Sequence, residues 1–208
     1  MKQLPLLFVL VFGLSLCNLT ERFRQSGSSG GSSSTTASES GAKAEKAQPS
    51  AAQLAALAGG QNITWDKQGM SWTVPPNWTK TTDETKSLVW RSPGSFDAAS
   101  LIVSISPMDR NFPTDSSLQA FYDGAKTRMD NGEVDELKWI EIDGLKGVQF
   151  RESNPESPDG HRRLQWLAYR DYAGQVQMVN LMLATTGKEF ARHQDTMYAI
   201  LYSTKIVH

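Results

Sequence analysis

Apolar and polar residues alternate at the period of a β-strand in several stretches of the chain, and this pattern predicts a sheet. The predicted strands cover residues 69–74, 87–91, 100–106, 136–142, 145–152, 162–172 and 175–184. Two pairs of strands are joined by short turn sequences, DGL at 143–145 and YAG at 172–174. Such turns favour hairpins, so we expect a largely antiparallel sheet.

Two segments have apolar residues at helical spacing instead. The first follows the sequence PTDSSLQ, in which Ser116 and Gln119 have the spacing of a capping box, and it ends at 131–132. The second begins at Thr186, with Glu189 three residues later. Each predicted helix has one apolar face to bury against a sheet.

The stretch VQMVNLMLA is apolar on nearly both faces, which is typical of a central strand with cover on both sides. Together with the two one-sided helices, it predicts layers in the order helix, sheet, helix. The expected fold class is α+β, an α/β/α sandwich built on a largely antiparallel sheet.

The N-terminal residues follow neither pattern. Met1 and Lys2 precede an apolar run, 4–16, which has the form of a secretory signal and is too short to span a bilayer. The sequence LSLC at its end resembles the lipobox of bacterial lipoproteins, although Leu16 departs from the small residue usual before the cysteine. We therefore predict that 1–16 is a signal peptide and that Cys17 is acylated and anchors the protein to a membrane. A soluble secreted or periplasmic protein, cut elsewhere, is the alternative.

Residues 17–61 are rich in Ser, Gly and Ala and contain few large apolar side chains. Such a segment buries too little apolar surface to offset the entropy lost on ordering, so we predict a flexible linker. Within it, AAQLAALA is expected to form a helix only transiently. The folded domain is predicted to span 62–208.

Charge and cysteine content narrow the possible partners. The 208 residues include 21 Lys and Arg against 22 Asp and Glu, and nucleic-acid binding relies on a basic excess that this chain lacks. We therefore expect no nucleic-acid partner. A single cysteine forms no internal disulfide.

Four stretches follow one another in a recognisable order: GMSWTVPPNW at the start, a helix with SLQAFYDGAKTRM, the hairpin IDGLKGVQF and a closing helix that ends in ILYSTKIV. This order resembles that of the PsbP-like and DcrB-like domains. It covers about residues 63–207. The resemblance implies an α/β/α sandwich and a non-enzymatic binding or assembly module, and it transfers no active-site residue.

The sequence contains no Gly-x-Ser-x-Gly elbow, no phosphate-binding Gly loop and no His-Glu-x-x-His helix, and a Ser-x-x-Lys match, SGAK, falls in the predicted linker, where we interpret it as chance. The histidines, His161, His193 and His208, occur in none of the local signatures of zinc or nucleophile chemistry. The acidic stretch DNGEVDE at 130–136 does not fit a calcium-loop register, so we interpret it as a solvated turn, with a weak cation site as the alternative. We therefore predict no catalytic residue, no metal and no cofactor.

Two features are candidates for binding. Arg162 and Arg163 follow the loop NPESPDGH, where their guanidinium groups are suited to a carboxylate or phosphate, although a solvated hairpin tip is the simpler interpretation. Trp65 lies at the predicted domain edge, exposed to a partner or else part of the core.

These features together predict a membrane-anchored protein of the bacterial cell envelope with a protein or cell-wall partner. The alternative is an envelope hydrolase whose active site is assembled from residues distant in sequence.

Overall fold

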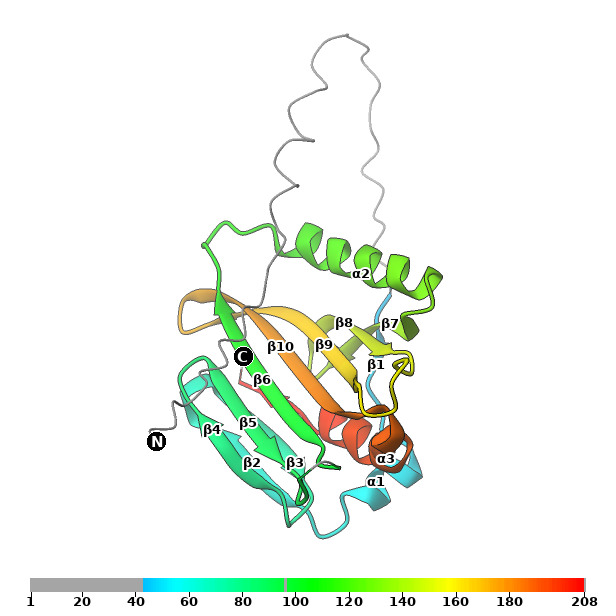
Figure 1. Ribbon diagram of the computed structural model, residues 1–208. Helices are drawn as coiled ribbons and strands as arrows, with labels where there is room; N and C mark the ends of the chain where they lie inside the picture. The colour runs from blue at the N-terminus through cyan, green and yellow to red at the C-terminus, as the bar shows by residue number, and fades with distance from the viewer. Residues whose placement is uncertain (1–42, 96, 208) are drawn as a thin grey trace, which may run out of the picture. The chain divides into compact units, whose positions relative to one another are not determined.

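The computed structural model describes residues 43–95 and 97–207. The predicted signal peptide and Cys17 lie outside these residues. Within the described part of the chain, eight strands form one sheet in the order β1-β7-β8-β9-β10-β6-β5-β4 (Figure 1). Their bounds are β1 Glu45–Lys46, β4 Thr79–Asp83, β5 Ser87–Arg91, β6 Ser100–Pro107, β7 Val134–Ile142, β8 Leu145–Glu152, β9 His161–Tyr172 and β10 Gln175–Thr186. All neighbours are antiparallel except β1 and β7.

The two predicted hairpins are confirmed. Asp143 and Gly144 join β7 to β8 with φ angles of 49° and 84°, and Ala173 and Gly174 join β9 to β10 with φ angles of 52° and 76°. Positive φ at both central residues is the backbone twist that two-residue hairpins favour. A second, smaller antiparallel sheet has the order β11-β3-β2, with bounds Lys205–Ile206, Met70–Val74 and Gln61–Trp65.

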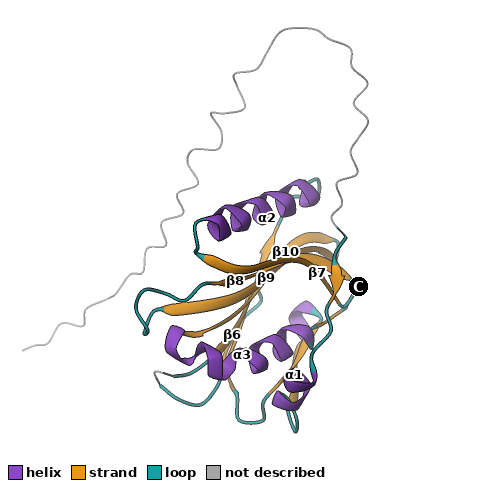
Figure 2. Ribbon diagram, turned by 90° about the vertical axis from the view of Figure 1, so that its right-hand side faces the viewer, coloured by secondary structure: helices purple, strands orange, loops and turns teal. Residues whose placement is uncertain are grey.

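Helices lie on both faces of the large sheet, as Figures 1 and 2 show. Helix α2 (Thr114–Asp130) packs on β7, β8 and β9. Helix α3 (Gly187–Tyr202) packs on the opposite face, together with α1 (Ala51–Ala56) and the small sheet. Two apolar clusters fill the two interfaces, the larger between the sheets and α3 and the smaller under α2. The predicted α/β/α sandwich is therefore confirmed.

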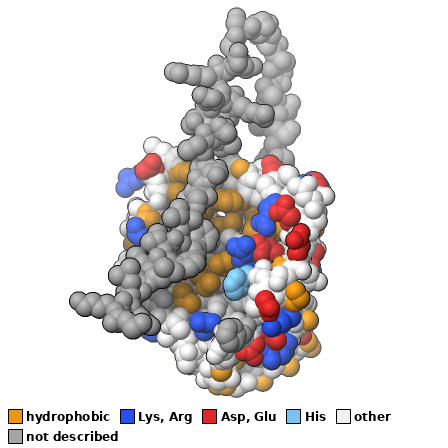
Figure 3. Space-filling view, in the orientation of Figure 1, with side chains coloured by type: hydrophobic (Ala, Val, Ile, Leu, Met, Phe, Trp, Pro, Cys, Tyr) orange, Lys and Arg blue, Asp and Glu red, His pale blue; other side chains and the backbone are white. Residues whose placement is uncertain are grey.

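Helix α2 covers only part of its face of the sheet. On β10, the residues Val179, Leu181 and Leu183 are fully buried toward α3, whereas Met178 and Met182 on the other side are half-buried. Figure 3 shows hydrophobic side chains in the middle of this face, with basic and acidic side chains gathered at one side. We predicted that β10 is covered on both sides. The structure covers it completely on the α3 side and only partly on the α2 side.

The helix starts differ in detail from the prediction. Helix α2 begins at Thr114, after Pro113, so Ser116 lies inside the helix and makes no capping box. Pro113 is the N-cap residue, with a non-helical ψ of 76°, and its missing N–H removes no hydrogen bond of the helix at this position. Thr186 is the N-cap of α3, as predicted, but its hydroxyl makes no capping hydrogen bond.

Residues 43–60, assigned from the sequence to the linker, form part of the folded unit. Strand β1 pairs with β7, and α1 packs on α3. Ser50 and Gln53 form a capping box, in which Gln53 N donates to Ser50 Oγ at 3.2 Å and Ser50 N donates to Gln53 Oε1 at 2.9 Å. A helix of this length is not stable by itself, so the capping box and the packing on α3 stabilise it. The folded unit therefore begins earlier than residue 62.

Candidate functional site

A polar groove lies between β7 and β8, the C-terminal half of α3 and the segment that enters α1. Its volume is about 360 Å³. The lining side chains are Gln48, Ser50, Gln53, Glu136, Lys138, Arg151, Gln194, Tyr198 and Tyr202. We call this site the polar groove.

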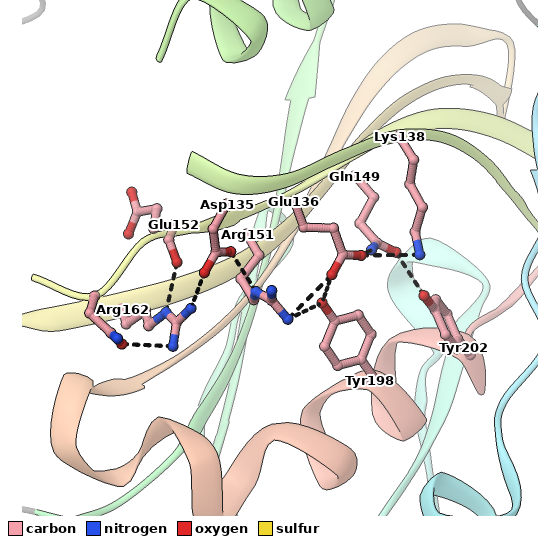
Figure 4. A network of polar contacts seen from close by, with 10 residues as sticks. Asp135, Glu136, Lys138, Gln149, Arg151, Glu152, Arg162, Tyr198 and Tyr202 are labelled. Carbon is pink, nitrogen blue, oxygen red and sulfur yellow. Dashed lines mark hydrogen bonds and ion pairs between the residues drawn. The ribbon is translucent and has the colours of Figure 1, made fainter. Parts of the chain in front are cut away.

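Strand pairing and helical spacing place these side chains together. Glu136 pairs with Arg151 across β7 and β8, and Lys138 pairs with Gln149, so the four side chains share one face of the sheet. Tyr198 and Tyr202 are four residues apart on α3 and therefore point the same way, toward that face (Figure 4).

A β-bulge shapes the charged part of the groove. The register of β7 against β8 shifts between Val134 and Glu136. In a regular strand, neighbouring side chains point to opposite faces. Here Asp135 Oδ1 accepts from Arg151 Nε at 2.6 Å, while Glu136 Oε2 lies 3.3 Å from Arg151 Nη1. The extra residue of the bulge thus brings two adjacent carboxylates onto one guanidinium.

Glu136 is the centre of the hydrogen bonding. Its Oε1 accepts from Gln149 Nε2 at 2.7 Å and pairs with Lys138 Nζ at 3.1 Å. Its Oε2 accepts from the Tyr198 hydroxyl at 2.5 Å and pairs with Arg151 Nη1. Both carboxylate oxygens are therefore occupied by two donors each (Figure 4).

Charges alternate along the network to which Glu136 belongs. Arg162 Nη2 pairs with Asp135 Oδ2, Asp135 with Arg151, Arg151 with Glu136, and Glu136 with Lys138 (Figure 4). Each carboxylate therefore lies between two cations, and no two like charges are adjacent along the network. The network has three cations and two anions.

The protonation of the groove follows from this arrangement. Burial, and then its hydrogen bond to Glu136, raise the pKa of the Tyr198 phenol well above its ordinary value. Partial burial by itself lowers the pKa of Lys138, but Tyr202 and Glu136 outweigh it and the net pKa is raised. Burial likewise opposes the charge of Arg151, and the hydrogen bond with Asp135 helps to raise the net pKa above the ordinary value. Tyr198 is thus neutral, and both cations are charged, at neutral pH.

The two arginines predicted as binding residues lie in different environments. Arg162 is only 8% exposed. Its Nε donates to the Glu152 carbonyl at 2.7 Å, its Nη1 donates to Asn154 Oδ1 at 2.8 Å, and its guanidinium stacks 4.2 Å from the centre of the Phe190 ring. Arg162 is therefore a buried structural residue and not an exposed one.

Arg163 points to the other face of the sheet. Its side chain is 43% exposed and pairs with Glu152 Oε2 at 2.8 Å, and Arg128 pairs with the other oxygen of Glu152 at 3.1 Å. Because successive residues of a strand point to opposite faces, Arg162 and Arg163 do not form one site.

Trp65 is 1% exposed, and its indole Nε1 donates to the Glu84 carbonyl at 3.0 Å. It is a core residue, so the alternative in which an exposed indole meets a partner is excluded for this side chain.

The groove itself was missed in the sequence. Glu136, Lys138 and Arg151 lie along strands and match no motif, and nothing in the helical spacing of the second helix marks Tyr198 as a site residue. The acidic stretch 130–136 gave the available signal. The carboxylates of Asp135 and Glu136 pair with arginine and lysine. Within residues 43–95 and 97–207, no cluster of three or more His, Cys, Asp or Glu side chains is arranged to hold a metal ion.

Among the helices of the described chain, none has the length and apolar character that a membrane crossing requires.

Comparison with known proteins identifies the fold. No protein-family model matches the chain, and no curated protein sequence matches it. Among solved structures, LpqN of Mycobacterium tuberculosis aligns with a TM-score of 0.53 and 13% identity, over 72% of this chain and 86% of LpqN.

Two further structures align at lower scores. Cyanobacterial PsbP (CyanoP) of Synechocystis aligns with a TM-score of 0.45 and 14% identity, over 71% of this chain and 92% of CyanoP. The Ran-binding protein Mog1p of Saccharomyces cerevisiae aligns with a TM-score of 0.41 and 10% identity, over 71% of this chain and 95% of Mog1p. The domain has the PsbP/Mog1-like fold, as the resemblance in sequence predicted.

Proposed function

We propose that this protein is an envelope-associated binding module without catalytic activity, that acylated Cys17 holds it at a membrane, and that the polar groove is its ligand site. We propose that the folded domain binds a cell-wall polymer. The alternative function is a hydrolase that cleaves the same polymer, and the experiments below distinguish binding from cleavage.

The state of Glu136 carries this proposal. A general base needs a free oxygen that reaches the substrate, and a general acid or nucleophile needs a pKa suited to its task. Both oxygens of Glu136 already accept two contacts each. The Tyr198 phenol has a raised pKa and donates to Glu136, so it is a poor nucleophile. The groove therefore holds polar groups in place and leaves donors at its rim, as a binding site does.

The envelope location rests on two observations. The first is the N-terminal sequence, with its apolar run and Cys17. The second is the fold shared with LpqN, a protein described as involved in cell envelope biogenesis. At 13% identity the likeness concerns the fold alone, and it supports the envelope role as an analogy.

The anchor is tested on the full chain expressed in a bacterial host. We expect the protein in the membrane fraction, with an N-terminal peptide that starts at Cys17 and carries added acyl mass. The matched control is Cys17→Ala, for which we expect the protein in the soluble fraction or retained with an uncleaved signal. An unmodified N-terminus after residue 17 in the natural chain would refute the anchor and leave the binding role to be judged separately.

The binding role is tested by co-sedimentation of the full chain, in detergent, with purified cell-wall sacculi. We expect the protein to sediment with the sacculi and the sacculi to keep their turbidity and release no soluble fragments. Release of fragments that stops in a Glu136→Gln variant would establish the hydrolase instead. Failure to sediment would refute the cell-wall partner.

A further inference from the structure

We infer that the polar groove binds an oxyanion, a carboxylate or a phosphate carried by an envelope polymer, and that Lys138 and Arg151 are its binding residues. The inference rests on the proposed function, in which the groove is the ligand site, and it names the chemistry of the ligand.

The hydrogen-bonding groups left in the groove are mainly donors. Nη2 of Arg151 donates to no residue that the structure describes. Lys138 has three N–H groups and one ion pair, with Glu136, and its Nζ lies 5.9 Å from the centre of the Tyr202 ring, so at least one N–H is left. The side-chain nitrogen of Gln53, Nε2, and the whole side-chain amide of Gln194 also have no hydrogen-bond partner within the described chain.

The acceptors next to Lys138 and Arg151 are occupied, whereas the side-chain oxygens of Gln48 and Gln194 have no partner within the described chain. The carboxylate of Glu136 meets four donors, and Gln149 Oε1 accepts from the Tyr202 hydroxyl at 3.2 Å. The Tyr198 hydroxyl donates to Glu136 and lies 3.3 Å from Arg151 Nη1. A ligand that fills the remaining capacity must therefore accept several hydrogen bonds, and a carboxylate or phosphate group does so.

The charge of the groove points to the same ligand. Its lining contains two cations, Lys138 and Arg151, and one anion, Glu136. Both cations are partly buried, with side chains 29% and 19% exposed, so their attraction for an anion is screened less by salt than that of fully exposed groups. Bulk solvent still reaches them, so a ligand can replace the water.

The C-terminal end of α3 borders the groove, and its carbonyl groups would by themselves repel an anion. Ser203 N donates to the carbonyls of Ala199 and Ile200, and Ser203 Oγ donates to Ile200. Thr204 N and Thr204 Oγ1 both donate hydrogen bonds to the Leu201 carbonyl. Three carbonyls of the last turn are thus satisfied, which weakens the repulsion near Tyr202.

The test is a titration of the full chain, in detergent, followed by the NMR shifts of the backbone amides of the groove. The probes are D-glucuronate, which has a carboxylate, glucose 6-phosphate, which has a phosphate, and D-glucose as the neutral analogue. We expect shifts confined to β7, β8, α3 and the segment that enters α1 with one or both anions, and none with D-glucose at the same concentration. The two anionic probes distinguish a carboxylate ligand from a phosphate ligand.

Variants connect the signal to the named residues. For Lys138→Gln we expect the Kd of the bound anion to rise at least about tenfold, because a charge-assisted hydrogen bond is lost, whereas Lys138→Arg restores binding to within about threefold, because it keeps the positive charge and its hydrogen-bond donors. The control is Lys126→Gln on α2, an exposed lysine with one ion pair at 3.5 Å to Asp130, for which we expect no change. The shift map of the natural chain locates the site even if a variant folds poorly.

Separate outcomes refute the inference and the proposed function. Equal shifts with D-glucose and D-glucuronate, unaffected by Lys138→Gln, would overturn the oxyanion and leave the groove as a binding site for a neutral sugar. Shifts outside the groove, or none with any probe, would also overturn it. Only the absence of sedimentation with sacculi bears on the proposed partner.

Discussion

The two adjacent arginines of β9 offer the sharpest test of the structure. Substitution of Arg162 by Ala removes a side chain that is 10% exposed and takes one donor from each of three acceptors: the Glu152 carbonyl, Asn154 Oδ1 and Asp135 Oδ2. Removing one partner of a buried ion pair costs about 3–5 kcal/mol. Asp135 is 34% exposed and keeps its contact with Arg151, so we expect the lower end, about 3 kcal/mol.

Substitution of Arg163 by Ala provides the comparison. Its side chain is 43% exposed, and Glu152 retains Arg128 as a partner. An exposed ion pair contributes roughly 0–1 kcal/mol, so we expect a loss of about 1 kcal/mol at most. The two substitutions remove the same kind of side chain at neighbouring positions, so the expected difference comes from the surroundings of Arg162: its burial, its hydrogen bonds and its stacking on Phe190.

The measurement is urea unfolding of the full chain followed by tryptophan fluorescence, with thermal unfolding beside it. One kcal/mol shifts Tm by about 2–4 °C for a chain of this size, so Arg162→Ala should lower Tm by roughly 6–12 °C and Arg163→Ala by roughly 4 °C at most. Equal losses for the two variants, or a larger loss at Arg163, would refute the assignment of Arg162 as a buried structural residue. Unchanged stability with lost partner binding would restore it as a binding residue.

Three further predictions concern other parts of the fold. Substitution of Gly147 by Ala places a Cβ 2.3 Å from Trp166 Nε1, and we expect a loss of at least about 2 kcal/mol in urea unfolding, whereas Gly124→Ala meets nothing within 4 Å and should cost no stability. Because the pKa of Tyr198 is raised in the folded state, its contribution to the free energy of unfolding is present below about pH 10 and is lost as the pH rises further. In Tyr198→Phe the free energy of unfolding, measured by urea titration, should therefore decline less steeply above pH 10 than in the natural chain. Identical slopes for the two proteins would contradict the raised pKa. Substitution of Ser50 by Ala removes the cap of α1 and should cost about 1 kcal/mol, or a fall in Tm of roughly 2–4 °C; an unchanged Tm would mean that residues 43–60 are a linker after all.

Much of the architecture was predictable because it depends on neighbouring residues. The strands 87–91 and 145–152 match the prediction at both ends, and the turns at Asp143–Gly144 and Ala173–Gly174 have the positive φ angles expected of tight hairpins. The short strands β1, β2, β4 and β11 were missed, because two to five residues carry too little alternation to separate them from loops.

The groove was not predictable for a related reason. Glu136 and Arg151 are 15 positions apart in a hairpin, and Tyr198 is much further along the chain. A bulge at Val134–Glu136, which the sequence does not signal, turns Asp135 and Glu136 to the same guanidinium. Only the packing of α3 on this face brings the phenol to Glu136.

The sequence by itself determined the largely antiparallel sheet, its two tight hairpins and the two long one-sided helices, because period and turn chemistry are properties of consecutive residues. Tertiary structure decided which of two adjacent arginines is buried, that Trp65 belongs to the core, and that 43–60 joins the domain. It also assembled the groove. Each of these outcomes depends on which surface packs against a residue, and that surface comes from elements far away in the sequence.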